Sequence, residues 1–142
     1  MKTLKIQIVT ALLIVFSTTA FASDIEKNER IKVNHTLQKY IDALSYGKIN
    51  GIADVFDSQA KFTITGGRKT INYNKAQMLN SLHAIENIKQ NCATSFSFIE
   101  LNAAQVIVKV TMKYEGFSRV NFLNMANTAD GWKITNVSSS FI

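Results

Sequence analysis

Side chains able to transfer protons, attack a substrate or hold a metal are scarce in this sequence. It contains ten Asp and Glu residues, two His and one Cys, and no group of them has the spacing of a metal site. No Gly-rich phosphate loop follows a strand pattern, and no serine has the context of a nucleophile elbow. Cys92 has no histidine near it in the sequence, which favours a buried thiol over a nucleophile. The sequence therefore predicts no metal and no cofactor.

Proton transfer in a pocket would need a titratable group that faces inward. The ten acids fall at expected helix ends, off the apolar stripe of a helix, near hairpins or in turns, and none stands clearly on an inward strand position. Of the two histidines, His35 lies opposite the apolar stripe of its helix, and His83 flanks the stripe of a later helix. An enzyme built from this chain would have to use a non-obvious base such as His83, with Tyr40 as a hydroxyl donor. We assign no catalytic residue, and enzymatic activity stays open.

Aromatic rings and amides are what a pocket in this chain would contain, and such a lining is typical of ligand sites. Arg119 could reach the rim of the pocket and meet an anion. The alternative is that the rings only pack in the core and that the Tyr40 hydroxyl bonds to a local partner. Asn124 and Asn136 share strand parity with two of the rings, and buried amides need partners that a ligand could supply. The predicted ligand-binding residues are Tyr40, Phe62, Tyr73, Phe122, Asn124, Trp132 and Asn136.

The opposite parity of the last strands carries Leu123, Met125, Val137 and Phe141. On this assignment these residues lie on the outer face of the sheet, which makes that face apolar. An apolar outer face suits a contact between two copies of the chain. We therefore predict a homodimer through the outer face of the sheet.

The elements that position these residues follow from hydrophobic periodicity. Steps of three and four residues predict helices over residues 24–46, 49–56 and 75–87, with Asn74 as the cap of the last. Strands are predicted over residues 60–65 and 68–73 around the Gly66-Gly67 turn, and four more over residues 92–142. Turns at Asn102-Ala103, Glu115-Gly116 and Asp130-Gly131 separate those four strands, and the even-numbered residues of 106–114 face the core. Helices on one face of an antiparallel sheet make an α+β domain.

The first 22 residues have the order of a secretory signal. Lys2 and Lys5 precede an apolar run over residues 6–16, and Ala20-Phe21-Ala22 has the small-residue pattern of a cleavage site. The apolar run is shorter than the about 20 residues that a membrane-spanning helix needs. We expect cleavage before residue 23, a single domain over residues 23–142, export to the periplasm or the medium, and no membrane attachment afterwards. After residue 22 the basic residues are spread along the chain without a Lys or Arg run, so nucleic acid is not an expected partner.

Three stretches of the chain resemble the nuclear-transport-factor-2-like superfamily. Residues 37–56, which begin Leu37-Gln38-Lys39-Tyr40, are similar to the opening helix pair of ketosteroid isomerases and polyketide-cyclase-like proteins. The second stretch is the helix capped by Asn74 after two strands, and the third is Asp130-Gly131-Trp132-Lys133-Ile134. Their order and spacing cover nearly all of the chain after the leader. Within the superfamily, the chain looks most like a group described as putative lumazine-binding proteins.

The resemblance implies a cone in which three helices pack on a curved, mainly antiparallel sheet of about six strands, with a pocket at the wide end. The isomerases use an aspartate that matches Ile64 here, a helix tyrosine that matches Tyr40, and a further acid near residues 120–124, where this chain has none. An enolising site without its base loses most of its rate. We therefore predict an exported pocket protein that binds a small organic ligand. The alternatives are an isomerase-like or cyclase-like enzyme that uses Tyr40 and a non-obvious base, and a dimerising interaction module.

Overall fold

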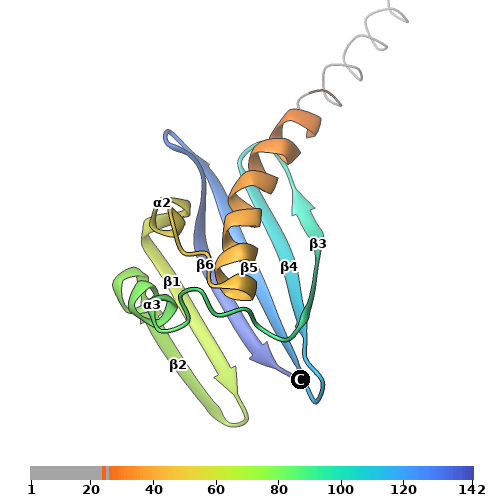
Figure 1. Ribbon diagram of the computed structural model, residues 1–142. Helices are drawn as coiled ribbons and strands as arrows, with labels where there is room; N and C mark the ends of the chain where they lie inside the picture. The colour runs from red at the N-terminus through yellow and green to blue at the C-terminus, as the bar shows by residue number, and fades with distance from the viewer. Residues whose placement is uncertain (1–23, 25) are drawn as a thin grey trace, which may run out of the picture.

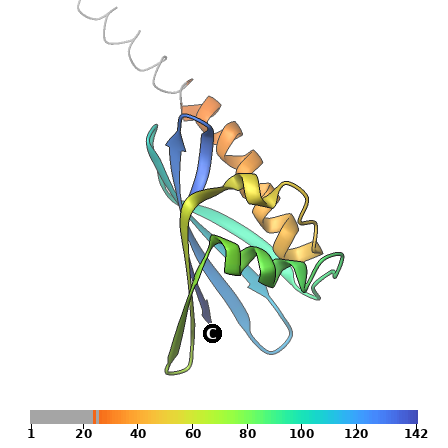
Figure 2. The same cartoon turned by 90° about the vertical axis from the view of Figure 1, so that its left-hand side faces the viewer.

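The computed structural model describes residue 24 and residues 26–142, so the leader predicted over residues 1–22 lies outside the described residues. The N-terminal helix covers residues 26–46. Along the chain follow α2 (Ile52–Val55), β1 (Phe56–Gly66), β2 (Lys69–Asn74), α3 (Lys75–His83), β3 (Ala93–Leu101), β4 (Gln105–Lys113), β5 (Ser118–Thr128) and β6 (Gly131–Phe141). The three helices lie on the same side of one curved sheet (Figure 1 and Figure 2). The predicted α+β architecture is confirmed.

The N-terminal helix buries one stripe of side chains against the sheet. Val33, Leu37, Tyr40 and Leu44 recur at three- and four-residue steps, and each is at most 5% exposed. The helix stops before Gly47, whose φ of 66° lies in the left-handed region that favours glycine. The long amphipathic helix predicted over residues 24–46 is therefore confirmed over the described residues.

A reciprocal cap begins α3. The Asn74 side chain accepts from the Gln77 N–H at 2.9 Å, and the Gln77 side chain accepts from the Asn74 N–H at 2.9 Å. The helix ends at His83 rather than near residue 87, because the backbone beyond it bonds three residues back instead of four. The second helix, α2, is also shorter than predicted, because Phe56 already begins β1.

The six strands form one sheet in the order β2-β1-β6-β5-β4-β3. Strands β3 to β6 form the meander that the three predicted turns require, and each pairs antiparallel with the next. The hairpin of β1 and β2 joins the meander through a parallel pairing of β1 with β6. An early hairpin is thereby attached to the last strand of the chain.

Strand β4 shows which face of the sheet the helices cover, which we call the inner face. Val106, Val108, Val110 and Met112 point to it, and each is at most 1% exposed. This alternation is the predicted one. The beginning of β5 and the end of β6 extend past the C-terminal end of the N-terminal helix (Figure 1). We call this uncovered end of the inner face the wide end. Among the described residues, no helix is long and apolar enough to cross a membrane.

Candidate functional site

An aromatic row leads from the N-terminal helix to β1 and β2, and consists of Tyr40, Phe56, Phe62 and Tyr73. Tyr40 meets Phe56 edge-to-face with ring centroids 6.4 Å apart, and Phe56 meets Phe62 in the same way at 4.9 Å. Tyr73 of β2 is the register partner of Phe62 of β1, so the two share a face, and Tyr73 is half-buried. The structure therefore brings together three of the predicted site residues, Tyr40, Phe62 and Tyr73.

A polar cluster follows the aromatic row toward the wide end and consists of Arg119, Asn121 and Ser139. Ser139 lies two residues beyond Val137, the β6 partner of Phe62, and is paired with Asn121 of β5. Asn121 Oδ1 accepts hydrogen bonds from Arg119 Nε at 3.0 Å and from Ser139 Oγ at 2.6 Å. Arg119 Nη2 lies 3.4 Å from Ser139 Oγ. The three side chains form one hydrogen-bonded unit.

The amide nitrogen of Asn121 is the unusual atom of this polar cluster. Asn121 is 0% exposed, and in the part of the chain that the structure describes its Nδ2 is the one buried side-chain N or O atom without a hydrogen-bond partner. The orientation of the amide is determined, because Arg119 Nε is a donor and must face the amide oxygen. An unsatisfied buried donor costs about 1–3 kcal/mol. A hydrogen-bond acceptor from outside the chain would remove this cost.

Burial and a nearby guanidinium act in opposite directions on the phenols around the polar cluster. Burial raises the pKa of Tyr40 to about 12, and the positive charge of Arg119 lowers it by a smaller amount. The pKa of Tyr114 is also raised, by burial first and then by the Cys92 thiol, and Arg119 again opposes the rise. Cys92 itself is half-buried rather than fully buried as predicted. Tyr40 therefore keeps its proton at neutral pH.

The raised pKa of Tyr40 predicts a loss of stability in alkali. The unfolded chain would ionise this phenol near its usual value of 10.0, whereas the folded protein keeps the proton until about pH 12. The resulting stabilisation is complete below pH 10.0 and is lost as the pH rises through 12, an effect of roughly 2–3 kcal/mol. Urea unfolding across this range should give a flatter pH profile for Tyr40→Phe than for Tyr46→Phe, whose ring is 44% exposed. Identical profiles for the two variants would contradict the assignment.

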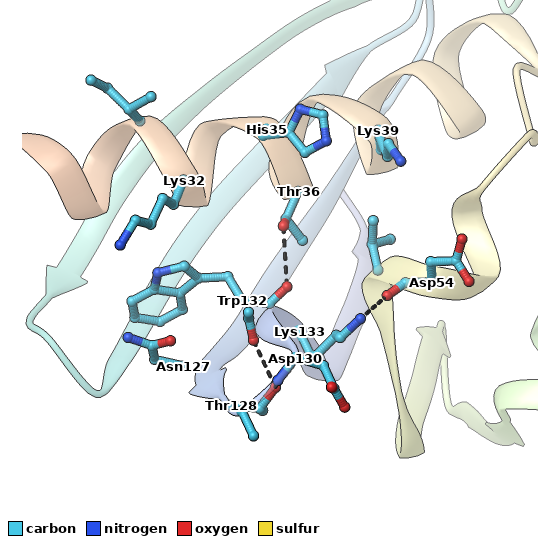
Figure 3. Close-up of a pocket in the computed structure, with 14 residues that line it drawn as sticks. Lys32, His35, Thr36, Lys39, Asp54, Asn127, Thr128, Asp130, Trp132 and Lys133 are labelled. Atoms are coloured by element: carbon cyan, nitrogen blue, oxygen red, sulfur yellow. Dashed lines mark hydrogen bonds between the residues drawn. The ribbon is translucent and has the colours of Figure 1, made fainter.

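Trp132 lies at the opposite end of the molecule, in a groove of about 680 Å³ between the N-terminal helix, α2 and the β5–β6 hairpin (Figure 3). Its indole Nε1 donates to Glu29 Oε2 at 2.7 Å. Two lysines of the groove are also engaged, since Lys32 pairs with Glu29 at 3.0 Å and Lys133 donates to the Asp54 carbonyl. The groove has the size of a ligand pocket. Much of its polar lining is already paired, and Trp132 is the one predicted site residue that lines it.

Three predicted site residues, Phe122, Asn124 and Asn136, lie on the outer face of the sheet, so the inward placement predicted for them is wrong. Phe122 is 42% exposed. Asn124 stands two residues further along β5, and Asn136 is its partner in the ladder, so all three share one face. The structure therefore does not bring the seven predicted residues together in one site.

Leu123, Met125 and Val137, predicted for the outer face, lie in the core instead, and each is at most 2% exposed. On β5 the inward set includes Asn121, Leu123 and Met125, because Asn121 pairs with Val110 of the inner face. On β6 the reason is a bulge, because the register with β5 shifts between Asn124 and Met125. Across this bulge Trp132 and Val137 are both buried, although strict alternation would place them on opposite faces. The apolar surface that suggested a dimer is therefore not on the outer face. The homodimer stays a prediction without that support.

His83, the base considered for catalysis, does not lie at the polar cluster. The His83 side chain is 65% exposed, and its Nδ1 lies 3.8 Å from Glu86 Oε2. It lines a separate surface groove of about 240 Å³ that Tyr40 does not line. Ile64, the position matched to the isomerase base, is half-buried and pairs with Ser139. Among residues 24 and 26–142 no group of three or more potential metal ligands occurs.

Asn121 and Ser139 carry no motif that singles them out in the sequence, since each is a small polar residue in a strand of mixed polarity. Arg119, expected at the rim, is half-buried within the polar cluster. The arrangement as a whole offers hydrogen-bond donors beside aromatic rings. Such a combination can bind an organic molecule that has an apolar body and a polar acceptor group.

Solved structures share the fold at low sequence identity. A nuclear-transport-factor-2-like protein of unknown function from Silicibacter pomeroyi has a TM-score of 0.70 and 10% identity, covering 82% of this chain and 98% of that one. Another from Shewanella baltica has a TM-score of 0.70 and 13% identity, covering 81% and 94%. A cystatin-like fold protein from Burkholderia xenovorans has a TM-score of 0.63 and 15% identity, covering 81% and 92%. At such identities these likenesses establish the fold alone.

A family model described as putative lumazine-binding matches residues 28–139. The match runs from the N-terminal helix into β6 and includes the polar cluster. No curated protein matches the sequence.

Proposed function

The chain belongs to the family described as putative lumazine-binding and has the nuclear-transport-factor-2-like fold, and from this premise we propose that it binds a small organic molecule on the inner face of its sheet. The proposed site is formed by the aromatic row and by the polar cluster, at the wide end. Because this fold serves enzymes and binding proteins alike, the proposal rests on these side chains and not on the fold.

The observation that carries the proposal is the unpartnered Nδ2 of Asn121. Native structures rarely leave a fully buried side-chain donor unsatisfied, because no hydrogen bond then offsets the free energy lost on desolvation. The amide oxygen of the same side chain accepts two bonds, from Arg119 and Ser139. These two bonds hold the side chain in one orientation, in which its nitrogen has no partner among the described residues. A ligand acceptor is the partner that would complete this arrangement.

Binding without catalysis is favoured by the chemistry of the same residues. Arg119 and Ser139 are bonded to Asn121. Tyr40, whose pKa is raised to about 12 by burial, holds its proton at neutral pH. A neutral phenol and a guanidinium can hold a ligand, but neither is a general base at pH 7. Apolar Ile64 stands where the isomerases have their proton-shuttling aspartate. The enzyme alternative would need a base from elsewhere.

Export is part of the same proposal, and it rests on the signal-like sequence of residues 1–22. The intact mass of the protein recovered from the periplasm or medium of a producing cell would check it. A mass that includes residues 1–22 would contradict cleavage before residue 23.

Thermal unfolding in the presence of single compounds tests the proposed site. We expect at least one member of a library of pteridines, other aromatic heterocycles and aromatic acids to raise the melting temperature. A compound present at roughly 100 times its Kd stabilises the folded state by about 2.7 kcal/mol. The Asn121→Leu variant should remain folded and lose this response, because the amide is replaced by an apolar side chain of similar size.

The matched control is Asn124→Leu, which removes the same amide from the same strand on the outer face. This variant should keep the full response to the compound. Loss of the response in both variants, or in neither, would mean that the compound binds elsewhere. No response to any compound in the wild-type protein, together with an inner face filled by side chains in a crystal structure, would end the proposal.

A further inference from the structure

The guanidinium of Arg119 has no anionic partner in the chain. Residues 24 and 26–142 include all ten acids of the sequence, and none of their carboxylates lies within 4.0 Å of Arg119. Its hydrogen bonds go to neutral acceptors, the Asn121 amide oxygen and the Ser139 hydroxyl. A half-buried cation has lost part of its hydration. Hydrogen bonds to neutral acceptors offset less of that lost free energy than bonds to a carboxylate would. This observation is independent of the unpartnered amide nitrogen.

We propose that the ligand of this site carries a carboxylate, which Arg119 and the Nδ2 of Asn121 bind together. The inference rests on the proposed function and names the class of ligand. Arg119 and Asn121 are two residues apart on β5, so their side chains leave the sheet on the same face. A guanidinium has more N–H donors than the two bonds to Asn121 and Ser139 use, and the amide nitrogen has two N–H donors of its own.

The unpaired groups of the proposed site are hydrogen-bond donors. They therefore favour a carboxylate over polar ligand groups that carry donors of their own. The Arg119 guanidinium and Asn121 Nδ2 can only donate. A carboxylate has only acceptor sites, and its negative charge matches the guanidinium. A carboxamide would place its own NH₂ group among donors. The site should therefore discriminate between an acid and the amide of the same shape.

Exposed aromatic rings at the wide end indicate an apolar body for the ligand. Phe141, predicted for the outer face, is 46% exposed, and its ring centroid lies 6.0 Å from the Arg119 guanidinium carbon. Phe117 is 45% exposed, stacks on Tyr114 at 4.6 Å, and has its ring centroid 6.1 Å from that of Phe141. Rings exposed beside a cation can cover the flat body of a bound acid. The ligand class is accordingly a small aromatic carboxylate.

Paired probes that differ only in charge test the inference. Benzoate, phenylacetate and indole-3-acetate are titrated calorimetrically into the purified protein, each beside its own carboxamide. We expect at least one acid to bind roughly tenfold or more tightly than its amide, since charge-assisted hydrogen bonds are about twice as strong as neutral ones. Binding of the acid should weaken as salt is added, because the guanidinium is only half-buried.

Two variants test whether the preference for the acid over its amide comes from the polar cluster. Asn121→Asp puts a carboxylate next to Arg119, so it should raise the melting temperature of the free protein and weaken binding of the acid roughly tenfold or more. Arg119→Met should weaken the acid to the level of its amide. The control Lys109→Met removes one positive charge from the residue opposite Phe122, on the outer face, and should leave the acid-to-amide ratio unchanged. Far-ultraviolet circular dichroism establishes that each variant is folded.

Failure of this inference can be told apart from failure of the proposed function. If amides bind as well as acids, or if Arg119→Met leaves the ratio unchanged, the carboxylate is not recognised, although the site still binds small molecules. If other library compounds bind through Asn121 while no acid of the panel binds better than its amide, the inference is likewise overturned. If neither these probes nor any library compound binds, the binding function itself fails.

Discussion

The Gly47→Ala variant should unfold at a much lower urea concentration than the wild-type protein, with a loss of about 3 kcal/mol in the free energy of unfolding. A Cβ at this position would lie 2.3 Å from the Ile85 carbonyl oxygen and 2.6 Å from the backbone nitrogens of Asn87 and Ile88. These contacts are with backbone atoms, which cannot rotate away as a side chain can. The left-handed φ of 66° adds strain for any residue with a side chain.

The close approach at Gly47 exists because the segment after α3 is hydrogen-bonded to the end of the N-terminal helix. The Asn87 N–H donates to the Gly47 carbonyl at 2.9 Å, and the Gln90 N–H donates to the Ser45 carbonyl at 2.8 Å. Gly67→Ala is the matched control, because its φ is also positive, at 58°, while a Cβ there would meet nothing within 4 Å. It should cost about 1 kcal/mol from conformation alone. Equal losses in the two variants would show that the backbone contacts at Gly47 relax without cost.

Leu123→Ala should lower the free energy of unfolding by about 2–5 kcal/mol, whereas Phe122→Ala, at the next residue, should lower it by about 1 kcal/mol or less. Leu123 is 0% exposed in the core and Phe122 is 42% exposed on the outer face. Removing buried methyl groups costs their transfer energy and leaves a cavity, whereas truncating an exposed ring leaves none. Urea unfolding of both variants at one temperature measures the difference.

The pair is informative because the larger side chain should matter less. If the order is reversed, and Phe122→Ala proves the more damaging change, β5 would have the opposite face toward the helices. Phe122 would then be buried, and Asn121 would be on the surface. The proposed ligand site would then lose Arg119 and Asn121, because both would face away from the helices.

Local signals in the sequence predict much of the fold. The Asn74 cap and the stop at Gly47 each depend on residues that are neighbours in the chain, and each is found as expected. The last turn lies one residue earlier than predicted, at Ala129-Asp130, because Thr128 pairs with Gly131. Such features are set by backbone geometry and short-range hydrogen bonds. The alternation in β4 is equally plain, because its inward residues are all apolar. These elements together determine the order of helices and hairpins.

The face of β5 is where sequence parity fails. Both alternate sets of this strand mix polar and apolar residues. One set includes Asn121 and Leu123, and the other includes Phe122 and Asn124. The large ring of Phe122 favours a prediction that it faces the core. The pairing of β5 with β4 instead places Phe122 on the outer face. A two-residue turn at Glu115-Gly116 pairs residue 110 with residue 121, as the structure has it. Because Val110 faces inward, the hairpin register would have placed Asn121 inward as well.

The chemistry of the site depends on contacts that no local pattern encodes. The row of Tyr40, Phe56 and Phe62 joins a helix to a strand, and the cluster of Arg119 and Ser139 joins β5 to β6. The bulge between Asn124 and Met125 changes the phase of β6 without a glycine or proline to mark it. Tyr40, Phe62 and Tyr73 could be predicted because helix and hairpin periodicity suffices for them. The unpaired amide requires the complete sheet.

The parallel pairing of β1 with β6 has a consequence for how the chain acquires its structure. The β1–β2 hairpin contributes the edge of the sheet, but its neighbour there is the strand that ends at Phe141, next to the last residue. Until β6 has formed, β1 has no partner on its second side, so the early hairpin stays unattached to the meander. Sequence-distant pairing of this kind forms late and slowly. The joining of the early hairpin to the meander is therefore expected to be the slow step in forming the sheet.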